Sequence, residues 1–149
     1  MKPSFSHLDE RGAARMVNVG AKPVQHRRAV AAGTLVCARR TIRALKAAAL
    51  PKGDVLAVAR IAGIQAAKRT SELIPLCHLL PLHQVSVDFA VKVDRIEIRA
   101  AASTEGKTGV EMEALTAVAV AALTLYDMMK AVDKTMHIEG VTLLVKEKL

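Results

Sequence analysis

Residues 85–100 read VSVDFAVKVDRIEIRA, and this stretch determines the class of fold. Apolar side chains at every second position from Val85 to Val93 alternate with polar or small ones, which is the period-two pattern of a half-buried strand. Asp94 and Arg95 then provide a turn, and the sequence continues as RIEIRA, a second strand. The stretch therefore predicts an antiparallel β-hairpin with one face in the core.

Segments on both sides of the hairpin complete the order of elements. The sequence predicts a strand at 33–38, a helix capped by Thr41 up to residue 50, a helix capped by Asp54 that ends before Pro75, a helix at about 110–132, and a strand at 141–148 after a turn at Gly140. The order is β, α, β, β, α, β, with two helical segments after the first strand. This order is typical of the α+β, ferredoxin-like βαββαβ fold, an antiparallel sheet with helices on one face.

The length and composition favour one domain. A chain of 149 residues with 52% hydrophobic content is long enough for one core and short for two, so we interpret residues 1–149 as a single domain. Residues 1–30 are polar, basic and without steady periodicity. We expect them to form a mobile or extended N-terminal arm that can fold against another surface.

The net charge points to an anionic partner. Lys and Arg number 22 against 14 Asp and Glu, which gives a formal charge of +8. Such an excess favours a polyphosphate, a nucleotide or a nucleic acid. With two Phe, one Tyr and no Trp, the chain offers little on which unpaired bases could stack. A small phosphorylated ligand is therefore favoured, and a nucleotide- or RNA-binding module is the competing interpretation.

Cysteine usage indicates the cellular compartment. Cys37 and Cys77 have no metal-ligand or redox spacing and are too few for a disulfide framework, so we expect reduced thiols and a cytoplasmic protein. Nothing in residues 1–30 resembles a signal peptide, and the most apolar stretch, 114–126, is shorter than the ~20 residues needed to cross a bilayer. We expect no membrane role.

The residues GKT at 106–108 resemble part of a phosphate-binding loop. That motif requires a glycine five residues before Gly106, where Ala101 stands instead, so the match fails. A turn with Lys107 and Thr108 before a helix can still bind an anion through backbone N–H groups and the helix dipole. The sequence leaves this role and plain helix initiation equally open.

The long C-terminal helix carries Asp127 and Lys130 near its end, beside an apolar face. They can form an i,i+3 surface ion pair, or an acid–base pair if burial brings the lysine pKa down towards the working pH. Glu113 shares their helix face but lies about 21 Å away along the axis, at ~1.5 Å per residue. We therefore expect either two separate sites or one site that combines two subunits, and we favour the shared site.

Other polar residues have plain structural interpretations. Lys52 in the PKGD turn and Lys68 at a helix end can be solvated charges. His78 follows the apolar run LIPLC and can be a half-buried histidine. No second ligand lies at a useful spacing from it, so we expect no metal site.

Two long segments carry a family resemblance. The runs KGDVLAVARIAGIQAAKRTSELIPLCH (52–78) and EGKTGVEMEALTAVAVAALTLYDMMKAVDK (105–134) closely resemble the MoaC family of molybdenum cofactor biosynthesis. MVNVGAKP (16–23) and IEGVTLLVK (138–146) are similar to its opening and closing segments. The resemblance implies a ferredoxin-like subunit, assembled as a hexamer of three dimers. It also implies a lyase that converts 3′,8-cyclo-7,8-dihydro-GTP into cyclic pyranopterin monophosphate and releases pyrophosphate.

The resemblance also implies roles for individual residues. Asp127 in the YDM segment would be the catalytic carboxylate, with Lys130 and Lys52 as further catalytic residues. The residues implied to bind substrate or its phosphates are Leu76, Cys77, His78, Glu111, Met112, Glu113, Lys68, Arg28 and Lys146. We expect no resident cofactor, and the sequence leaves open whether a divalent ion accompanies the triphosphate.

Overall fold

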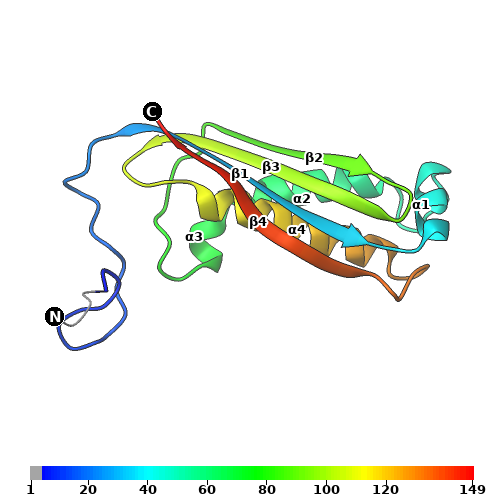
Figure 1. Cartoon of the computed structure of the whole chain (residues 1–149), viewed down its shortest axis with the longest axis horizontal. Helices are drawn as coiled ribbons and strands as arrows, with labels where there is room; N and C mark the ends of the chain where they lie inside the picture. Colours follow the sequence, from blue (N-terminus) through cyan, green and yellow to red (C-terminus); the bar gives the residue numbers. More distant parts are fainter. Residues whose placement is uncertain (1–4) are drawn as a thin grey trace.

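The computed structural model describes residues 5–149, and in this range the chain forms one four-stranded sheet and four helices. The elements are β1 (Gln25–Val36), α1 (Arg39–Lys46), α2 (Val55–Lys68), α3 (Thr70–Leu73), β2 (Gln84–Val91), β3 (Arg95–Gly106), α4 (Glu111–Met129) and β4 (His137–Lys148). The strand order is β2-β3-β1-β4, and every neighbouring pair is antiparallel. Helices α2 and α4 cover one face of the sheet, and α1 lies at one end (Figure 1). The predicted ferredoxin-like α+β fold is confirmed.

The hairpin forms as its sequence pattern predicts. β2 pairs with β3 so that Phe89 lies opposite Ile98, and β3 continues to Gly106. The alternate residues Val87, Ile96 and Ile98 face the helices and are at most 1% exposed. Because side chains alternate between the two faces of a strand, this register puts one row into the core and leaves the other on the open face.

The first strand is longer than predicted. β1 begins at Gln25 rather than residue 33, so residues 25–30 belong to the sheet and not to the N-terminal arm. Residues 1–4 of the predicted arm lie outside the described residues. The alternation in this strand is hard to recognise because Ala29 and Ala31 fill the core positions with very small side chains, and Val30 on the other face is also fully buried.

One of the two predicted helix caps is wrong. Thr41 lies inside the first turn of α1, whose N-cap residue is Ala38, and the buried Thr41 hydroxyl donates to Asp133 Oδ2 at 2.8 Å. Asp54 caps α2 as predicted, since its Oδ1 accepts from the backbone N–H of Ala57 at 3.0 Å. The prediction for Thr41 was wrong because α1 needs no side-chain cap of its own: the carboxylate of Asp133, distant in sequence, accepts the hydrogen bond from the backbone N–H of Ala38 at this end of the helix.

Gly140 lies within β4 rather than in a turn before it. The strand begins at His137, and Gly140 adopts a φ of +63° where the β1–β4 pairing shifts register between Ala32 and Thr34. An extra residue in one strand is a β-bulge, and glycine is suited to the left-handed backbone that it requires here. The bulge lets β4 continue along the whole length of β1.

Helix α4 is the central core helix. It packs against the sheet and against α2, where Gly63 lies so close that a Cβ would approach the Ala117 carbonyl oxygen to 2.9 Å. In length and composition α4 could cross a membrane, with 19 residues and a mean hydropathy of 1.4, but half of its apolar window is buried inside the domain. Its hydrophobicity is therefore explained by packing.

Candidate functional site

Polar residues gather at both ends of α4, and the two groups face different surroundings. At the C-terminal end, Asp127 lies between Lys52 and Lys130, and we refer to these three residues as the Asp127 cluster. At the N-terminal end, a cavity of about 500 Å³ is bounded by the start of α4, the segment after α3 and the N-terminal arm. These two places contain most of the residues singled out by the sequence.

The Asp127 cluster is a carboxylate bound by two ammonium groups. Lys130 Nζ lies 2.8 Å from Asp127 Oδ1, and Lys52 Nζ lies 2.9 Å from Asp127 Oδ2. Lys52 also donates to the backbone carbonyl of Asp127 at 3.1 Å. Lys52 lies 75 residues away from Asp127 in sequence, and the fold brings the two side chains together.

The local backbone explains how Lys52 reaches α4. Leu50 is buried in the core, Gly53 adopts a φ of +87°, and Asp54 caps α2, so the short turn between them is held on both sides. On the other side, the Lys130 N–H donates to the Tyr126 carbonyl at 2.9 Å and ends α4. Both lysines are therefore carried by defined backbone.

Protonation in this cluster is set by charge rather than burial. The hydrogen bonds and charges of Lys130 and then Lys52 lower the pKa of Asp127 to about 2. The bond to Asp127 raises the pKa of Lys130, whose side chain is 55% exposed, above its usual value. An acid–base pair would require burial to lower the lysine pKa, and in the single chain this condition is not met because both side chains remain open to solvent.

The cavity at the other end of α4 contains most of the residues implied to bind substrate. Its wall includes Leu76, Cys77 and His78 from the segment after α3, and Glu111 and Met112 from the first turn of α4. The N-terminal arm closes the opposite side. The structure thus brings together two predicted groups of residues that are more than 30 positions apart in sequence.

Glu113 is the most buried acid beside this cavity. It is 3% exposed, and its Oε1 lies 3.9 Å from Cys77 Sγ. Within residues 5–149 its Oε2 has no hydrogen-bond partner. Burial, together with the charge of Glu111, raises the pKa of Glu113 above its ordinary value, and burial also raises that of Cys77.

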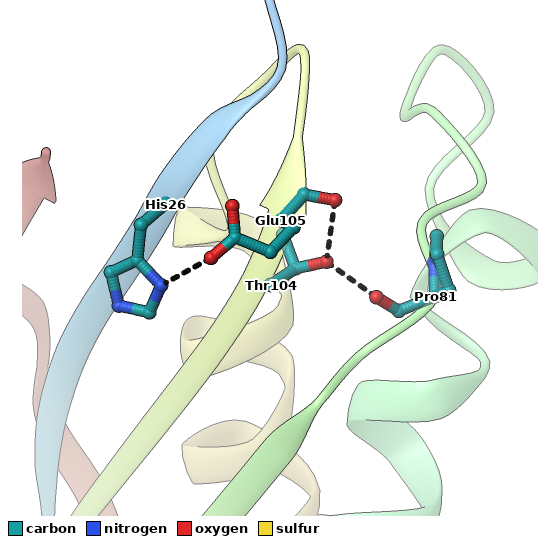
Figure 2. A network of polar contacts seen from close by, with 4 residues as sticks. All are labelled: His26, Pro81, Thr104 and Glu105. Carbon is teal, nitrogen blue, oxygen red and sulfur yellow. Dashed lines mark hydrogen bonds and ion pairs between the residues drawn. The ribbon is translucent and has the colours of Figure 1, made fainter.

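Backbone contacts hold the cavity walls in place. His78 Nε2 lies 2.6 Å from the Val17 carbonyl oxygen, and Lys107 Nζ donates to the Gly20 carbonyl at 2.5 Å, so both residues attach the arm to the domain. The buried Thr104 hydroxyl donates to the Pro81 carbonyl and ties the segment after α3 to β3 (Figure 2).

The first turn of α4 supplies its own negative charge. Glu111 Oε1 lies 2.5 Å from Lys146 Nζ on β4. Burial opposes ionisation of Glu111, but the bonds from Lys146 and from its own backbone N–H outweigh it and lower its pKa. A Cβ on Gly109 would lie 1.9 Å from Glu111 Oε2, so the carboxylate lies directly over that glycine. The GKT turn therefore starts a helix whose positive end already faces carboxylates.

Two residues named from the sequence lie away from both places. Arg28 lies on the open face of the sheet and pairs with Glu147 at 3.1 Å. Lys68 is exposed at the end of α2, and no ion pair or hydrogen bond joins it to other side chains in residues 5–149. The structure does not bring either residue to the cavity or to the Asp127 cluster.

Sequence reasoning missed Arg27, which is adjacent to Arg28. Arg27 is 9% exposed on the helix-covered face, and its charge helps to lower the pKa of Glu111 at the cavity. Within residues 5–149 its Nε has no hydrogen-bond partner. The period-two pattern could have identified it, because Arg27 has the same parity as the core residues Ala29 and Ala31.

Fold and site together define a small ferredoxin-like protein with a carboxylate–lysine cluster at one end of its core helix and a cavity beside a buried acid at the other. Comparison with known proteins assigns it more narrowly: residues 16–148 match the model of the MoaC family, and the chain belongs to that family. It is 58% identical to a cyclic pyranopterin monophosphate synthase of Chloroflexus aggregans over 95% of this chain and 87% of the relative. It is 57% identical to a protein of the same name from Novosphingobium aromaticivorans, over 95% and 90% of the two chains.

Proposed function

We propose that this protein is a cyclic pyranopterin monophosphate synthase. It converts 3′,8-cyclo-7,8-dihydro-GTP to cyclic pyranopterin monophosphate and releases pyrophosphate in molybdenum cofactor biosynthesis, and it acts in the cytoplasm. Family membership and identities of 57–58% over most of the chain support the reaction. The single structural observation that carries the proposal is the contact of Asp127 with Lys52 and Lys130, at 2.9 and 2.8 Å.

The Asp127 cluster suits repeated proton transfer on a phosphorylated ligand. A pKa of about 2 keeps Asp127 ionised at neutral pH but makes it a weak base in the single chain, so its role as a proton acceptor requires the neighbouring subunit to remove water from the cluster and raise that pKa. Lys52 and Lys130 are ammonium donors that can return a proton and stabilise negative charge on a phosphate or a departing pyrophosphate. Rearrangement of a purine into a pyranopterin with cyclic phosphate formation needs both functions at one place.

The cavity supplies a complementary set of groups. Glu113 can accept a hydrogen bond from the ligand, and burial raises its pKa, so it takes up a proton more readily than an exposed glutamate and can then donate it to a ring nitrogen or carbonyl. Cys77, His78 and Met112 surround the adjacent space, and Arg27 and Lys146 add positive charge near Glu111. We assign this place to recognition of the guanine-derived ring and part of the phosphate chain.

The distance between the two places suggests that each active site is shared by two subunits. Glu113 and Asp127 are 14 residues apart on one helix, which corresponds to about 21 Å. One reacting ligand cannot touch both within one chain. We propose that the Asp127 cluster of one subunit faces the cavity of its neighbour, in a hexamer built as three dimers. In this arrangement the neighbour would also remove water from the exposed cluster.

Mixing two inactive variants tests the shared site. Asp127→Asn damages one place and Glu113→Ala damages the other, so each homo-oligomer should be inactive. If subunits exchange after partial dissociation and remixing, mixed dimers should each regain one intact site, and activity should return to about a quarter of the parental value. Recovery indistinguishable from zero, with exchange verified by mass spectrometry of differently labelled subunits, would contradict the shared site.

The reaction itself is tested by anaerobic incubation with 3′,8-cyclo-7,8-dihydro-GTP. Release of one pyrophosphate per cyclic phosphate product, measured by phosphorus NMR, is the expected result. We propose that no resident cofactor takes part, and no group of three or more His, Cys, Asp or Glu in residues 5–149 is arranged to hold a metal. Turnover should therefore survive dialysis against a chelator, and any restoration by added Mg²⁺ would assign the ion to the triphosphate. An absence of product under these conditions would remove the proposed activity.

A further inference from the structure

Helix α1 presents a basic surface that the proposed catalytic residues do not include. Four of its eight residues, Arg39, Arg40, Arg43 and Lys46, are basic and exposed, and none of its residues is acidic. Within residues 5–149 none of the four forms an ion pair. We call these four residues the α1 basic face.

Hydrogen bonds place this face next to the Asp127 cluster. The N–H of Ala38, directly before α1, donates to Asp133 Oδ2 at 2.8 Å, and the Thr41 hydroxyl donates to the same atom at 2.8 Å. Asp133 follows Asp127 by only six residues. Helix α4 ends at Met129, but the Asp133 N–H still donates to the Met129 carbonyl at 3.2 Å, so this segment stays coiled and spans about 9 Å at ~1.5 Å per residue. The start of α1 therefore lies roughly 15 Å or less from the Asp127 cluster, and Figure 1 shows α1 at the same end of the sheet as the C-terminal end of α4.

Positive charge is concentrated around α1 and the C-terminal end of α4. Residues 39–54 and 127–134 together contain seven Lys or Arg and three Asp. Two of those carboxylates are already engaged, since Asp127 contacts two lysines and the buried Asp133 accepts four hydrogen bonds. Half of the net +8 of the chain thus lies in 24 of its 149 residues.

Helix stability explains the cations of the last turn, Arg43 and Lys46, but not the two cations of the first turn. Arg39 and Arg40 occupy the first turn, at the positive end of the helix dipole, where cations are unfavourable and acids are preferred. The N-cap residue Ala38 offers no side-chain acceptor, and the compensating negative charge comes from Asp133 on another segment. A solvated helix of this length would be more stable with neutral or acidic residues at these two positions.

We propose that the α1 basic face attracts the phosphate chain of a small anionic ligand to the Asp127 cluster by long-range electrostatics. This inference rests on the proposed function, which supplies a triphosphate as substrate. At an ionic strength of about 0.1 M the screening length is about 10 Å, so cations at this distance still raise the local concentration of a multiply charged anion. Because they do not touch the reacting atoms, they act on substrate capture and not on the chemical step.

Kinetics of charge variants at several salt concentrations test this proposal. The double variant Arg39→Gln/Arg40→Gln should raise KM about three- to tenfold at about 25 mM NaCl, with kcat within about twofold of the parent. The difference should vanish near 500 mM NaCl, roughly where screening reaches a few ångströms. Arg40→Glu should also raise KM at low salt.

Arg99→Glu is the matched control. It makes the same change of charge at an exposed position on the open face of the sheet. It should leave KM within about twofold of the parent at all salt concentrations. An unchanged KM in the double variant at low salt, or an equal effect of Arg99→Glu, would overturn the proposal.

Calorimetric binding of GTP and guanosine separates this inference from the proposed reaction. GTP should bind the parent more tightly than the double variant at low salt, and guanosine should bind both equally. If the parent binds GTP in this way but makes no product, the reaction is wrong and the anion-attracting face remains supported. If turnover is normal but GTP binding does not depend on Arg39 and Arg40, the inference alone fails. Tighter binding of generic RNA than of GTP would also overturn it, because the face would then serve a nucleic acid.

Discussion

The two ends of α4 hold carboxyl groups in opposite environments. Glu113 near the N-terminal end is 3% exposed and has a raised pKa, whereas Asp127 at the C-terminal end is 55% exposed and has a pKa of about 2. Burial dominates the first case and two neighbouring ammonium groups dominate the second. One apolar helix therefore carries an acid that ionises less readily than usual at one end and a carboxylate that ionises more readily than usual at the other.

This contrast is a physical reason for a site shared by two subunits. A reaction with several proton transfers needs a group that can donate and a group that can accept at the same pH. On a single helix these groups are too far apart to cooperate. Antiparallel association of two subunits would bring the Glu113 end of one α4 towards the Asp127 end of the other.

The largest expected effect comes from removing the ionised end. Asp127→Asn should lower turnover at least about 1,000-fold, equivalent to about 4 kcal/mol of transition-state stabilisation. Lys130→Ala should cause a loss of similar size. Both side chains are exposed, so thermal unfolding of the purified variants should remain close to the parent. Near-normal product formation by either variant would refute the assignment of the catalytic end.

A second prediction uses a third carboxylate to separate burial from hydrogen bonding. Asp133 is 1% exposed, like Glu113, but it accepts from the N–H groups of Ala38 and Thr135 and from the Thr41 and Thr135 hydroxyls, each at 2.7–2.8 Å. Burial opposes its ionisation, but these bonds outweigh that effect and hold its pKa well below its ordinary value. Burial alone therefore does not decide protonation at this protein's buried acids.

Asp133→Ala should lower the free energy of unfolding by about 3 kcal/mol, because four donors lose their acceptor. Since the folded-state pKa is depressed, the stabilisation is present above the unfolded value of 3.8 and is lost as pH falls below it. Urea unfolding of parent and variant at pH 7 and at pH 3 measures both effects. A difference that stays constant between these pH values would show that the carboxylate charge does not contribute.

Glu113→Gln tests the buried acid at the other end of α4 and should raise the free energy of unfolding, whereas Asp133→Ala lowers it. The folded-state pKa is raised, so ionisation of Glu113 destabilises the parent progressively as pH rises above 4.5. The amide removes that penalty and should stabilise the protein by about 1 kcal/mol at pH 8 and by less at pH 5. Urea unfolding at the two pH values is the measurement. A variant less stable than the parent at pH 8 would show that the carboxylate has a partner which compensates its burial.

The sequence predicted features that depend on local patterns and missed features that depend on the strand register. Period-two alternation at 85–93 predicted the hairpin because core and solvent positions differ strongly in polarity there. The first strand was predicted too short because alanines occupy core positions of β1 and weaken the alternation. The family resemblance pointed to Lys52 and Asp127, and the fold brings them together. It selected Arg28 instead of Arg27, because two adjacent arginines look alike until the strand register assigns each to a face.

Some properties of the two ends depend on surroundings that no local pattern contains. The ion pair between Asp127 and Lys52 joins residues 75 positions apart in sequence, so the residues around Asp127 do not reveal it. The role of Thr41 was misjudged because its partner, Asp133, lies 92 residues away in sequence. Protonation states depend on such long-range contacts, and they can be assigned only once the tertiary structure is known.

The smallest expected effect is a difference in salt response between the two ends. Raising NaCl from about 0.05 M to about 1 M shortens the screening length from more than 10 Å to about 3 Å. The attraction of Asp127 to its exposed lysines should weaken, so its pKa should rise from about 2 towards 3.8. The pKa of Glu113 should change less, because its shift arises mainly from burial, which salt does not screen. Carbon-detected NMR titration of the two carboxyl carbons follows both groups in one sample. An equal response would mean that the two ends share one electrostatic environment.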